Sequence, residues 1–214
     1  MTDAVCPVAN NGTGYLEMIM GPMYAGKTSR LIDIYNIYKA TPSPSYKESE
    51  ILVINHSMDT RYNSRVIGLC NHDKKFIPCL WANTLFDMVN LHGDIENKLD
   101  DKLFSNVKVI LINECQFFND IVEWVTLAVE KYHKIVYICG LDCDFKRNVF
   151  GNWLNLIKYA DNVVKLKANC ACCHTTNALY SHRLTDSDEQ ILIGHSEHEP
   201  LCRKCYLNKN MKTT

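Results

Sequence analysis

The 214-residue sequence lacks several features that would each have assigned it to a class. No apolar stretch reaches the roughly 18 residues of a membrane helix, and the start has no basic segment followed by an apolar one. Lys and Arg number 23 against 24 Asp and Glu, so no excess charge indicates nucleic acid or an anionic membrane as a partner. Glycine and proline number only nine and six, which excludes a collagen-like or low-complexity chain. We therefore expect a cytoplasmic globular protein that binds neither membranes nor nucleic acid.

Cysteine, by contrast, is abundant, with 11 residues. In a short secreted chain this would indicate a disulfide framework, but here the number is odd and the sequence shows no signal peptide. A chain of this length can bury about 70% of its unfolded surface, so its folding does not depend on disulfides. We therefore predict reduced thiols and a metal site.

Strand and helix patterns alternate through most of the chain. Four short apolar runs have the pattern of strands buried on both faces, at residues 15–20, 51–54, 107–112 and 134–139. Apolar residues recur at helical spacing in three segments, at 27–40, 85–99 and 121–129. Because parallel strands need crossover connections, this order predicts an α/β fold of the P-loop NTPase type, a mainly parallel sheet flanked by helices.

The composition changes at residue 168. Paired cysteines, polar residues and possible short strands near 177–181 and 190–193 follow, with no long helical pattern. We predict four regions: a disordered N-terminal tail (1–14), the α/β domain (15–167), a small zinc-binding module (168–207) and a C-terminal tail (208–214).

The segment GPMYAGKT at 21–28 fits the phosphate-binding loop pattern G-x-x-x-x-G-K-[ST] and lies between a predicted strand and a predicted helix. In such a loop the backbone N–H groups converge on phosphate oxygens, Lys27 reaches the β- and γ-phosphates, and Thr28 ligates Mg²⁺. The predicted ATP-binding residues here are Gly21, Pro22, Met23, Tyr24, Ala25, Gly26, Lys27 and Thr28. A chance glycine turn before a helix is the alternative interpretation.

Charged residues follow two of the predicted strands at their carboxyl ends, where ligands of open α/β sheets collect. Glu114 could accept the proton of an attacking hydroxyl, although a solvated glutamate near a helix start would look the same. Lys146 and Arg147 suit a polyphosphate, and a solvated charge pair in a loop explains them nearly as well.

Two C-x-x-C pairs, Cys170 with Cys173 and Cys202 with Cys205, have the spacing that places two thiolates on one metal. Four such sulfurs predict a closed tetrahedral structural Zn²⁺ site. The 28 residues between the pairs, 174–201, form a long loop that we expect to have a further role. Buried inert thiols or redox pairs are the alternative.

Taken together and in their order along the chain, these motifs resemble those of the zinc-containing, tetrameric class of thymidine kinases from animals, many bacteria and large DNA viruses. The similarity extends from about residue 15 to 207. The segments that carry it are GPMYAGKT (21–28), DTRY (59–62), NECQFF (113–118), FKRNVFG (145–151) and the two cysteine pairs.

The resemblance implies transfer of the γ-phosphoryl group of ATP to the 5′-hydroxyl of thymidine, with deoxyuridine as an alternative substrate and with Mg²⁺, structural Zn²⁺ and a homotetramer. It also implies that Glu114 is the catalytic base and that Asp59, Arg61 and Arg147 lie near the phosphates. Part of the loop between the cysteine pairs would fold over the nucleoside as a lasso. The implied nucleoside site consists of Met23, Gln116, Phe117, Leu141, Phe145, Tyr180, Gln190, Ile191, Leu192 and Ile193.

Two positions depart from the family pattern. Asn113 replaces an Asp, so it would bind Mg²⁺ only through water and without charge, and we expect Asn113→Asp to lower the Mg²⁺ requirement. His198 replaces a Tyr that closes on the nucleoside, which predicts altered nucleoside affinity that changes near the ordinary histidine pKa of about 6.5.

Three other functions fit parts of the sequence. A P-loop ATPase or GTPase switch would use Glu114 to position water, and would hydrolyse nucleotide without a nucleoside. A zinc-ribbon module with Arg203, Lys204 and Lys209 could bind nucleic acid, with a strong dependence on salt. A relative of the kinases could also have lost its activity through Asn113.

Overall fold

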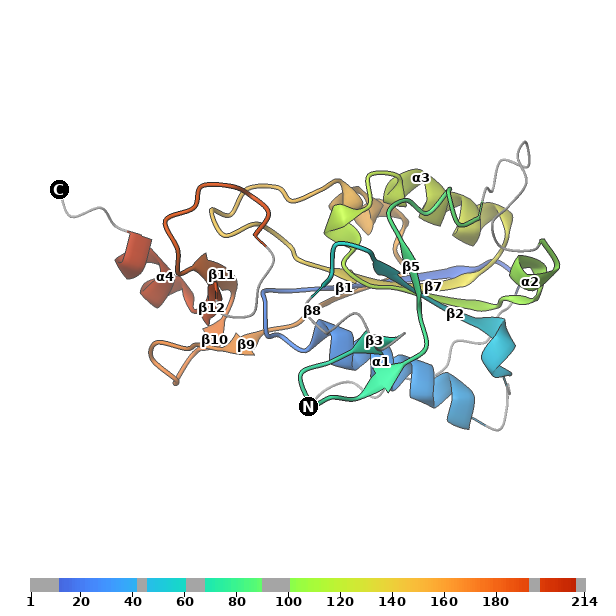
Figure 1. Cartoon of the computed structure of the whole chain (residues 1–214), viewed down its shortest axis with the longest axis horizontal. Helices are drawn as coiled ribbons and strands as arrows, with labels where there is room; N and C mark the ends of the chain where they lie inside the picture. The colour runs from blue at the N-terminus through green and yellow to red at the C-terminus, as the bar shows by residue number, and fades with distance from the viewer. Residues whose placement is uncertain (1–11, 42–45, 61–67, 90–100, 193–196, 211–214) are drawn as a thin grey trace.

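The computed structural model describes residues 12–41, 46–60, 68–89, 101–192 and 197–210. Its centre is a six-stranded sheet in the order β5-β2-β6-β7-β1-β8 (Figure 1). Every neighbouring pair in this sheet is parallel, which confirms the predicted α/β class. The six strands are β1 (Tyr15–Met20), β2 (Ile51–His56), β5 (Leu80–Ala82), β6 (Val109–Ile112), β7 (Ile135–Gly140) and β8 (Asn162–Lys165).

The four predicted strands are the four central ones. All residues of β2, β6 and β7 are buried, as expected for strands covered on both faces. Strand β1 has the predicted bounds, β2 extends two residues further than predicted, and β6 and β7 begin slightly later than the apolar runs. Because these four strands are neighbours and run parallel, their carboxyl ends lie side by side.

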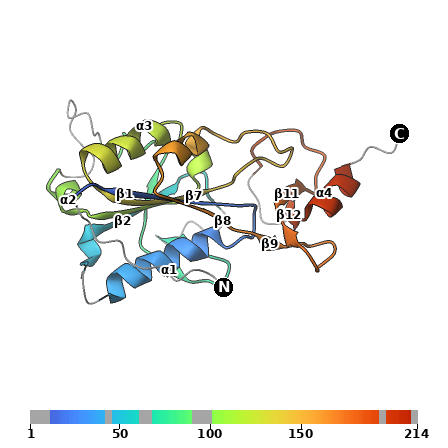
Figure 2. The ribbon, with the colours of Figure 1, turned by 180° about the vertical axis from the view of Figure 1, so that it is seen from behind.

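Helices cover both faces of the sheet (Figures 1 and 2). Helix α1 (Lys27–Ala40) has the predicted bounds and packs Leu31, Ile34, Tyr35 and Tyr38 against one face. On the other face lie α3 (Ile121–Thr126), its continuation as one π-helical turn, η3 (Leu127–Lys131), and the 3₁₀ helix η4 (Trp153–Tyr159). The short elements η1 (Glu48–Glu50), α2 (Asp101–Asn106) and η2 (Cys115–Phe117) complete this domain.

The prediction of a helix over 85–99 is wrong for the part that the structure describes. Leu85–Val89 forms a turn, and its N-terminal amides at Leu85 and Phe86 donate to Asp120 Oδ2 at 2.7 and 2.9 Å. Residues 90–100 lie outside the described residues. The apolar side chains of this turn are buried in the core, which accounts for their helix-like spacing.

Four described strands of the α/β domain escaped prediction: the edge strands β5 and β8, and the hairpin of β3 (Leu69–Cys70) with β4 (Phe76–Ile77). Each is short or largely exposed, so no continuous apolar run marks it. A sheet edge needs only one buried face, and a strand of two or three residues shows no periodicity.

The last part of the chain forms a separate module beyond the carboxyl edge of the sheet (Figure 1). It contains two antiparallel pairs, β9 (Ala168–Asn169) with β10 (Asn177–Ala178) and β11 (Tyr180–Arg183) with β12 (His198–Leu201), followed by α4 (Arg203–Asn210). The strand signal at 177–181 is therefore two strands, whereas 190–192 forms no strand. The predicted module boundary at Leu207 falls inside α4. Residues 1–11, most of the predicted disordered tail, lie outside the described residues.

None of the helices in the described part of the chain is long and apolar enough to cross a membrane.

Candidate functional site

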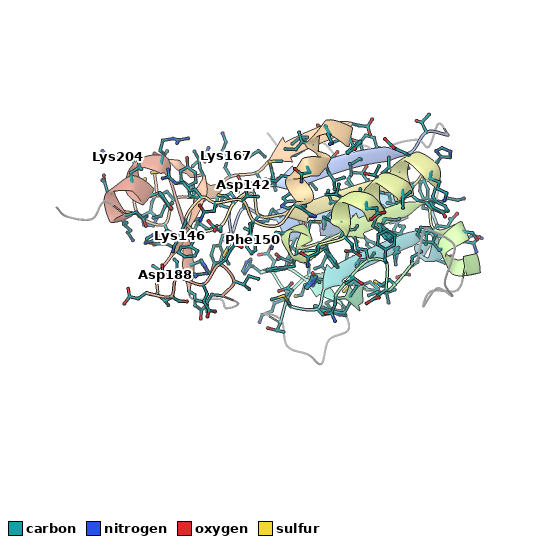
Figure 3. The ribbon with its side chains drawn as sticks, turned by 90° about the horizontal axis from the view of Figure 1, so that it is seen from above. Asp142, Lys146, Phe150, Lys167, Asp188 and Lys204 are labelled. Atoms are coloured by element: carbon teal, nitrogen blue, oxygen red, sulfur yellow. The ribbon has the colours of Figure 1, made fainter. Side chains whose placement is uncertain are left out.

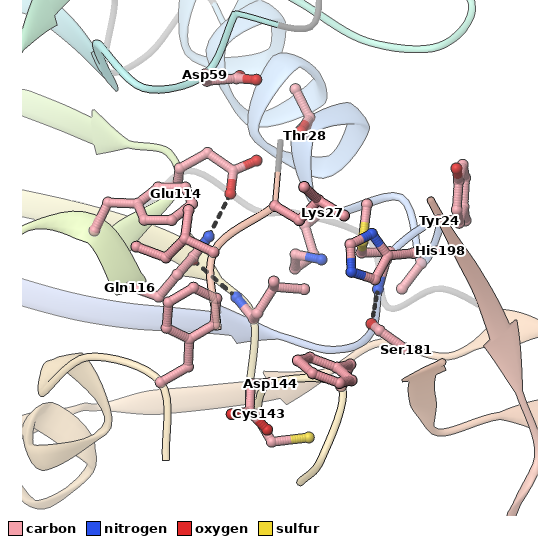
Figure 4. A pocket seen from close by; sticks show the side chains of 18 of the residues that line it. Tyr24, Lys27, Thr28, Asp59, Glu114, Gln116, Cys143, Asp144, Ser181 and His198 are labelled. Carbon is pink, nitrogen blue, oxygen red and sulfur yellow. Dashed lines mark hydrogen bonds between the residues drawn. The ribbon is translucent and has the colours of Figure 1, made fainter. Parts of the chain in front are cut away.

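One pocket lies at the carboxyl edge of the sheet, where the loops after β1, β2, β6 and β7 meet the module (Figure 4). It encloses about 1000 Å³, part of which is open solvent. Four of the predicted segments and the loop between the cysteine pairs contribute to its lining, which includes Met23–Thr28, Asp59, Glu114, Gln116, Phe117, Leu141, Phe145 and Gln190–Leu192. The sheet order explains this convergence, because parallel strands end at the same edge.

The segment 21–28 connects β1 to α1 as a tight turn, as its pattern predicts. A Cβ atom on Gly21 would lie 2.5 Å from the carbonyl oxygen of Leu166, so only glycine fits there. Lys27 Nζ donates to the carbonyl oxygens of Gly21 and Pro22 at 3.1 and 2.8 Å, which holds the ammonium group at the loop. Helix α1 begins at Lys27, so its N-terminal N–H groups face the same pocket.

Glu114 follows β6 with a left-handed backbone, φ 57° and ψ 43°, which is uncommon for a residue with a side chain. Its carboxylate is buried, and Gln116 Nε2 donates to Glu114 Oε2 at 2.5 Å (Figure 4). Gln116 Oε1 in turn accepts the Leu141 N–H at 3.0 Å, so Gln116 links the ends of β6 and β7. A strained backbone that aims a buried carboxylate into a pocket is typical of a functional position.

The apolar wall of the pocket is formed mainly by side chains from the ends of β6 and β7. Phe117 packs edge-on against Phe150, with ring centroids 5.5 Å apart. Gly151 allows this close approach, because a Cβ atom there would lie 2.3 Å from the carbonyl oxygen of Gln116. Phe145 carries the guanidinium of Arg183 3.8 Å above its ring. Apolar and aromatic walls with few polar groups suit a planar ring such as a nucleobase.

Two of the predicted side-chain contacts, those of Arg147 and Tyr180, are not in this pocket. Arg147 places its guanidinium over the rings of Tyr180 and Tyr206, at 5.6 and 5.0 Å, beside the pocket rather than in it. Tyr180 itself packs on Tyr206 at 5.0 Å and does not line the pocket. Arg61 and Ile193 lie outside the described residues. The pattern at 145–151 therefore contributes Phe145 and Phe150 to the pocket, and places Arg147 at the junction with the module.

That junction is made by the loop after β7. Tyr206 donates its hydroxyl to the carbonyl oxygen of Phe145 at 2.6 Å, and Lys146 pairs with Asp188 at 2.6 Å. Figure 3 shows Lys146, Asp188 and Phe150 between the sheet and α4. The ion pair is exposed and adds little stability, whereas the Tyr206 hydroxyl and the Arg183 guanidinium over the Phe145 ring join buried module residues to this loop.

Two module residues that the sequence did not indicate also reach the pocket. Ser181 Oγ accepts the Met23 N–H of the 21–28 loop at 2.9 Å. Arg183 is buried and donates to the carbonyl oxygens of Ser187, Glu189 and Gln190, which shapes the segment that lines the pocket. Nothing in the sequence indicates them, because β11 has four residues, too few for its alternating burial to appear as a periodic pattern.

His198 lines the pocket from β12 and is only 9% exposed. Arg183 Nε donates to His198 Nε2 at 3.2 Å, so the proton of the neutral ring is on Nδ1. Burial, followed by the neighbouring Arg183 charge, lowers the pKa of His198 to about 4. With this lowered pKa the ring is neutral near pH 6.5, so the structure does not support the change in affinity that the sequence led us to expect there.

The four predicted cysteines lie together in the module. Cys170, Cys173, Cys202 and Cys205 bring their sulfur atoms within 4.8 Å of one another, and Cys173 and Cys202 are 3.9 Å apart. A tetrahedral zinc with Zn–S bonds of about 2.3 Å requires S–S distances of about 3.8 Å, so the cluster has the right size. Hydrogen bonds from Thr175 lower the pKa of Cys173 to about 5, whereas the hydrogen bond with Cys202 raises the pKa of Cys205. This cluster could hold a structural zinc ion, whereas exposed Cys172 lies outside it.

The comparisons with known proteins agree with this geometry. The family model for thymidine kinase matches residues 14–206. A thymidine kinase of Yaba monkey tumor virus is 36% identical over 202 residues, which cover 94% of this chain and 99% of that protein. A vaccinia virus thymidine kinase is 36% identical over 91% of this chain and 98% of its own length. One from Oryza sativa is 35% identical over 91% of this chain and 67% of its own.

Proposed function

This chain belongs to the thymidine kinase family, and we propose that it transfers the γ-phosphoryl group of ATP to the 5′-hydroxyl of thymidine, giving thymidine monophosphate and ADP. One observation carries the proposal beyond the family: the phosphate loop, the buried Glu114 carboxylate and an aromatic wall line one pocket. A phosphate site, a base and a planar-ring site within one pocket are the parts that this reaction needs.

The phosphate end is formed by residues 21–28. The loop N–H groups and the start of α1 would bind the phosphate oxygens, and Lys27 would exchange its two carbonyl partners for the β- and γ-phosphates. Thr28 and Asp59 line this end and offer the hydroxyl and carboxylate oxygens that Mg²⁺ prefers. When bound, Mg²⁺ neutralises charge on the transferring phosphoryl group. We also propose Arg61 near the phosphates, whereas Arg147 would first have to leave the rings of Tyr180 and Tyr206.

Glu114 would accept the proton of the 5′-hydroxyl as that oxygen attacks the γ-phosphorus. The hydrogen bond from Gln116 fixes the direction of its carboxylate, and the left-handed backbone fixes its position at the end of β6. Such a general base contributes about 10²- to 10⁴-fold to the rate.

The nucleoside would occupy the aromatic end of the pocket. Met23, Phe117, Leu141 and Phe145 would contact the thymine ring, and the segment from Gln190 to Ile193 would close over it with backbone groups. Tyr180 would support this closure from behind, through its contact with Tyr206. Deoxyuridine, which lacks only the thymine methyl group, could bind in the same way.

The four-cysteine cluster fits a structural Zn²⁺, and we propose that this ion holds the module in place over the pocket. We further propose that the protein acts in the cytoplasm as a homotetramer, which light scattering of the zinc-loaded protein would test.

The decisive experiment measures phosphoryl transfer from ATP to thymidine by the full, zinc-loaded chain beside Glu114→Gln. We expect thymidine-dependent turnover that falls about 10²- to 10⁴-fold in the variant, with ATP binding retained. ATP hydrolysis that is independent of thymidine would favour an ATPase switch instead, and salt-dependent binding of DNA or RNA would favour a nucleic-acid module. A folded, zinc-loaded protein without any transfer would contradict the proposed activity.

A further inference from the structure

A continuous chain of side-chain hydrogen bonds lies behind the phosphate end of the pocket. Asn55 Nδ2 donates to Asp59 Oδ2 at 3.0 Å, and Asn113 Nδ2 donates to Asn55 Oδ1 at 2.9 Å. Asn113 Oδ1 lies 3.5 Å from Thr28 Oγ1, a weak contact that completes the path to the phosphate loop. Asp59 and Thr28, at the two ends, line the pocket, whereas the two asparagines lie behind it.

The two asparagines are among the most buried polar side chains in the described residues. Asn55 and Asn113 are each 1% exposed, so water cannot replace a hydrogen bond that either of them loses. Each comes from the carboxyl end of a central strand: Asn55 is in β2, and Asn113 follows β6. The chain therefore connects the loop after β2 to the loop after β1 across the end of β6.

Only one orientation of the two asparagine amides gives every donor in this row of hydrogen bonds an acceptor. The His56 N–H, which can only donate, contacts Asn55 Oδ1 at 3.1 Å, and the Asp59 carboxylate can only accept. These two neighbours fix the orientation of the Asn55 amide, and its oxygen then requires a donor from Asn113. The Asn113 oxygen is left facing two possible donors, the Cys139 thiol at 2.9 Å and the Thr28 hydroxyl.

We propose that Asn55 is a positioning residue for the metal–nucleotide end of the site. It holds the Asp59 carboxylate at a set place relative to the Thr28 hydroxyl, through Asn113, without touching the ligand. The proposal rests on the proposed function, because it assumes that Mg²⁺ and nucleotide phosphates bind between these two groups. It also assigns Asn113 a task that an aspartate could not perform, since Asn113 donates to Asn55.

Loss of this row of hydrogen bonds should affect the Mg²⁺-loaded and the metal-free nucleotide differently. Mg²⁺ requires near-octahedral oxygen geometry, so a displaced carboxylate weakens binding of the metal-loaded nucleotide. The metal-free nucleotide is held by the loop N–H groups and Lys27, which the chain does not contact. A purely structural role for Asn55 would weaken both forms equally.

The test is calorimetric binding of ADP to the full, zinc-loaded chain with Mg²⁺ and in buffer without added divalent cations. For Asn55→Ala we expect Kd for Mg²⁺-loaded ADP to rise about tenfold, and Kd for metal-free ADP to change by less than about threefold. Asn55→Leu, which nearly keeps the side-chain volume, should behave in the same way. Asn155→Ala, at an exposed position in η4, is the matched control and should change neither value.

A double-mutant cycle with Asn113→Ala tests whether the two asparagines act together. If they form one chain, the double variant should bind Mg²⁺-loaded ADP no more weakly than about the worse single variant. Additive losses, equal losses with and without Mg²⁺, or no loss in either folded Asn55 variant would each overturn the proposal. The outcome does not depend on phosphoryl transfer, so a failure to phosphorylate thymidine would count against the proposed function alone.

Discussion

The sheet and the cysteine module hold their parts of the pocket by different means. The sheet buries four central strands between helices, in clusters that contain long aliphatic and aromatic side chains from every layer. Among its described residues the module has a hydrophobic cluster of seven buried side chains, and three of them, Cys170, Cys202 and Cys205, are members of the sulfur cluster. A core this small does not support itself, and metals commonly stabilise such modules. We therefore expect the proposed phosphate site to depend on hydrophobic packing, and the proposed closure over the nucleoside to depend on the four thiols.

The largest effect should separate these two regions. We expect Cys202→Ser to lose zinc and to raise KM for thymidine more than about 100-fold, because structural zinc energy is folding energy in such modules. The affinity for ADP should change by less than about threefold, because the phosphate loop is held by the sheet. Zinc content, thymidine kinetics and calorimetry with ADP measure the three quantities.

Exposed Cys172 provides the matched control, since Cys172→Ser removes a neighbouring thiol that is outside the cluster. It should retain both zinc and activity. If Cys202→Ser lost ADP and thymidine binding in equal measure, the two regions would form one cooperative unit and the contrast between them would be wrong.

A smaller effect is expected from Arg183, which donates to the segment 187–190 and does not belong to the sulfur cluster. Arg183→Met leaves the carbonyl oxygens of Ser187, Glu189 and Gln190 without their donor. We expect KM for thymidine to rise about tenfold, with zinc retained and kcat changed less. Lys204→Met, at an exposed position in the same module, is the control for lost charge. Unchanged KM in Arg183→Met would show that the segment holds its shape without this residue.

On the sheet side, Asn113→Asp should lower the stability of the protein before any nucleotide binds. Aspartate cannot donate to Asn55 Oδ1, and it adds a second carboxylate to a buried chain that already holds Asp59. A cost of about 2 kcal/mol would lower Tm by about 5 °C.

Adding Mg²⁺ should raise Tm more in Asn113→Asp than in the wild type, because the ion offsets the added negative charge. The lower Mg²⁺ requirement expected from the sequence would then come with a loss of stability. The exposed variant Asn155→Asp adds the same charge and should leave Tm unchanged. If the variant were as stable as the wild type, the buried hydrogen bonds would tolerate either an acceptor or a donor at residue 113.

The smallest effect concerns pH and His198. Its folded pKa of about 4 lies below the ordinary value of 6.5, so the unfolded chain binds the proton more readily between these pH values. Stability should therefore fall as pH drops from 6.5 toward 4 and stay constant above 6.5, and this loss should be smaller in His198→Gln. Melting curves across that range measure the effect. Thymidine affinity should be flat from pH 5.5 to 8, and a transition near 6.5 would show that the ring is solvated.

Sequence patterns predicted the central strands of the sheet better than its edge strands. The strands β1, β2, β6 and β7 were recognisable because both of their faces are buried, so each is a continuous apolar run. Strand β8 lies at the edge with exposed side chains, and Leu85–Val89 is an apolar turn capped by Asp120, which no local pattern distinguishes from a helix. Spacing also predicted the four cysteines, because two thiolates from a C-x-x-C turn can share one metal.

Motifs in the sequence were sufficient to indicate the 21–28 loop, the position of Glu114 after a buried strand, the two cysteine pairs and the family, because each motif consists of residues close together in the chain. The partners of these residues were set only by the packing of remote segments. This packing placed Arg147 on tyrosines instead of in the pocket, lowered the pKa of His198 beside Arg183, and joined Asn55 to Asn113 across 58 residues. Burial, hydrogen-bond direction and distance between remote segments are set by packing, and no spacing along the chain records them.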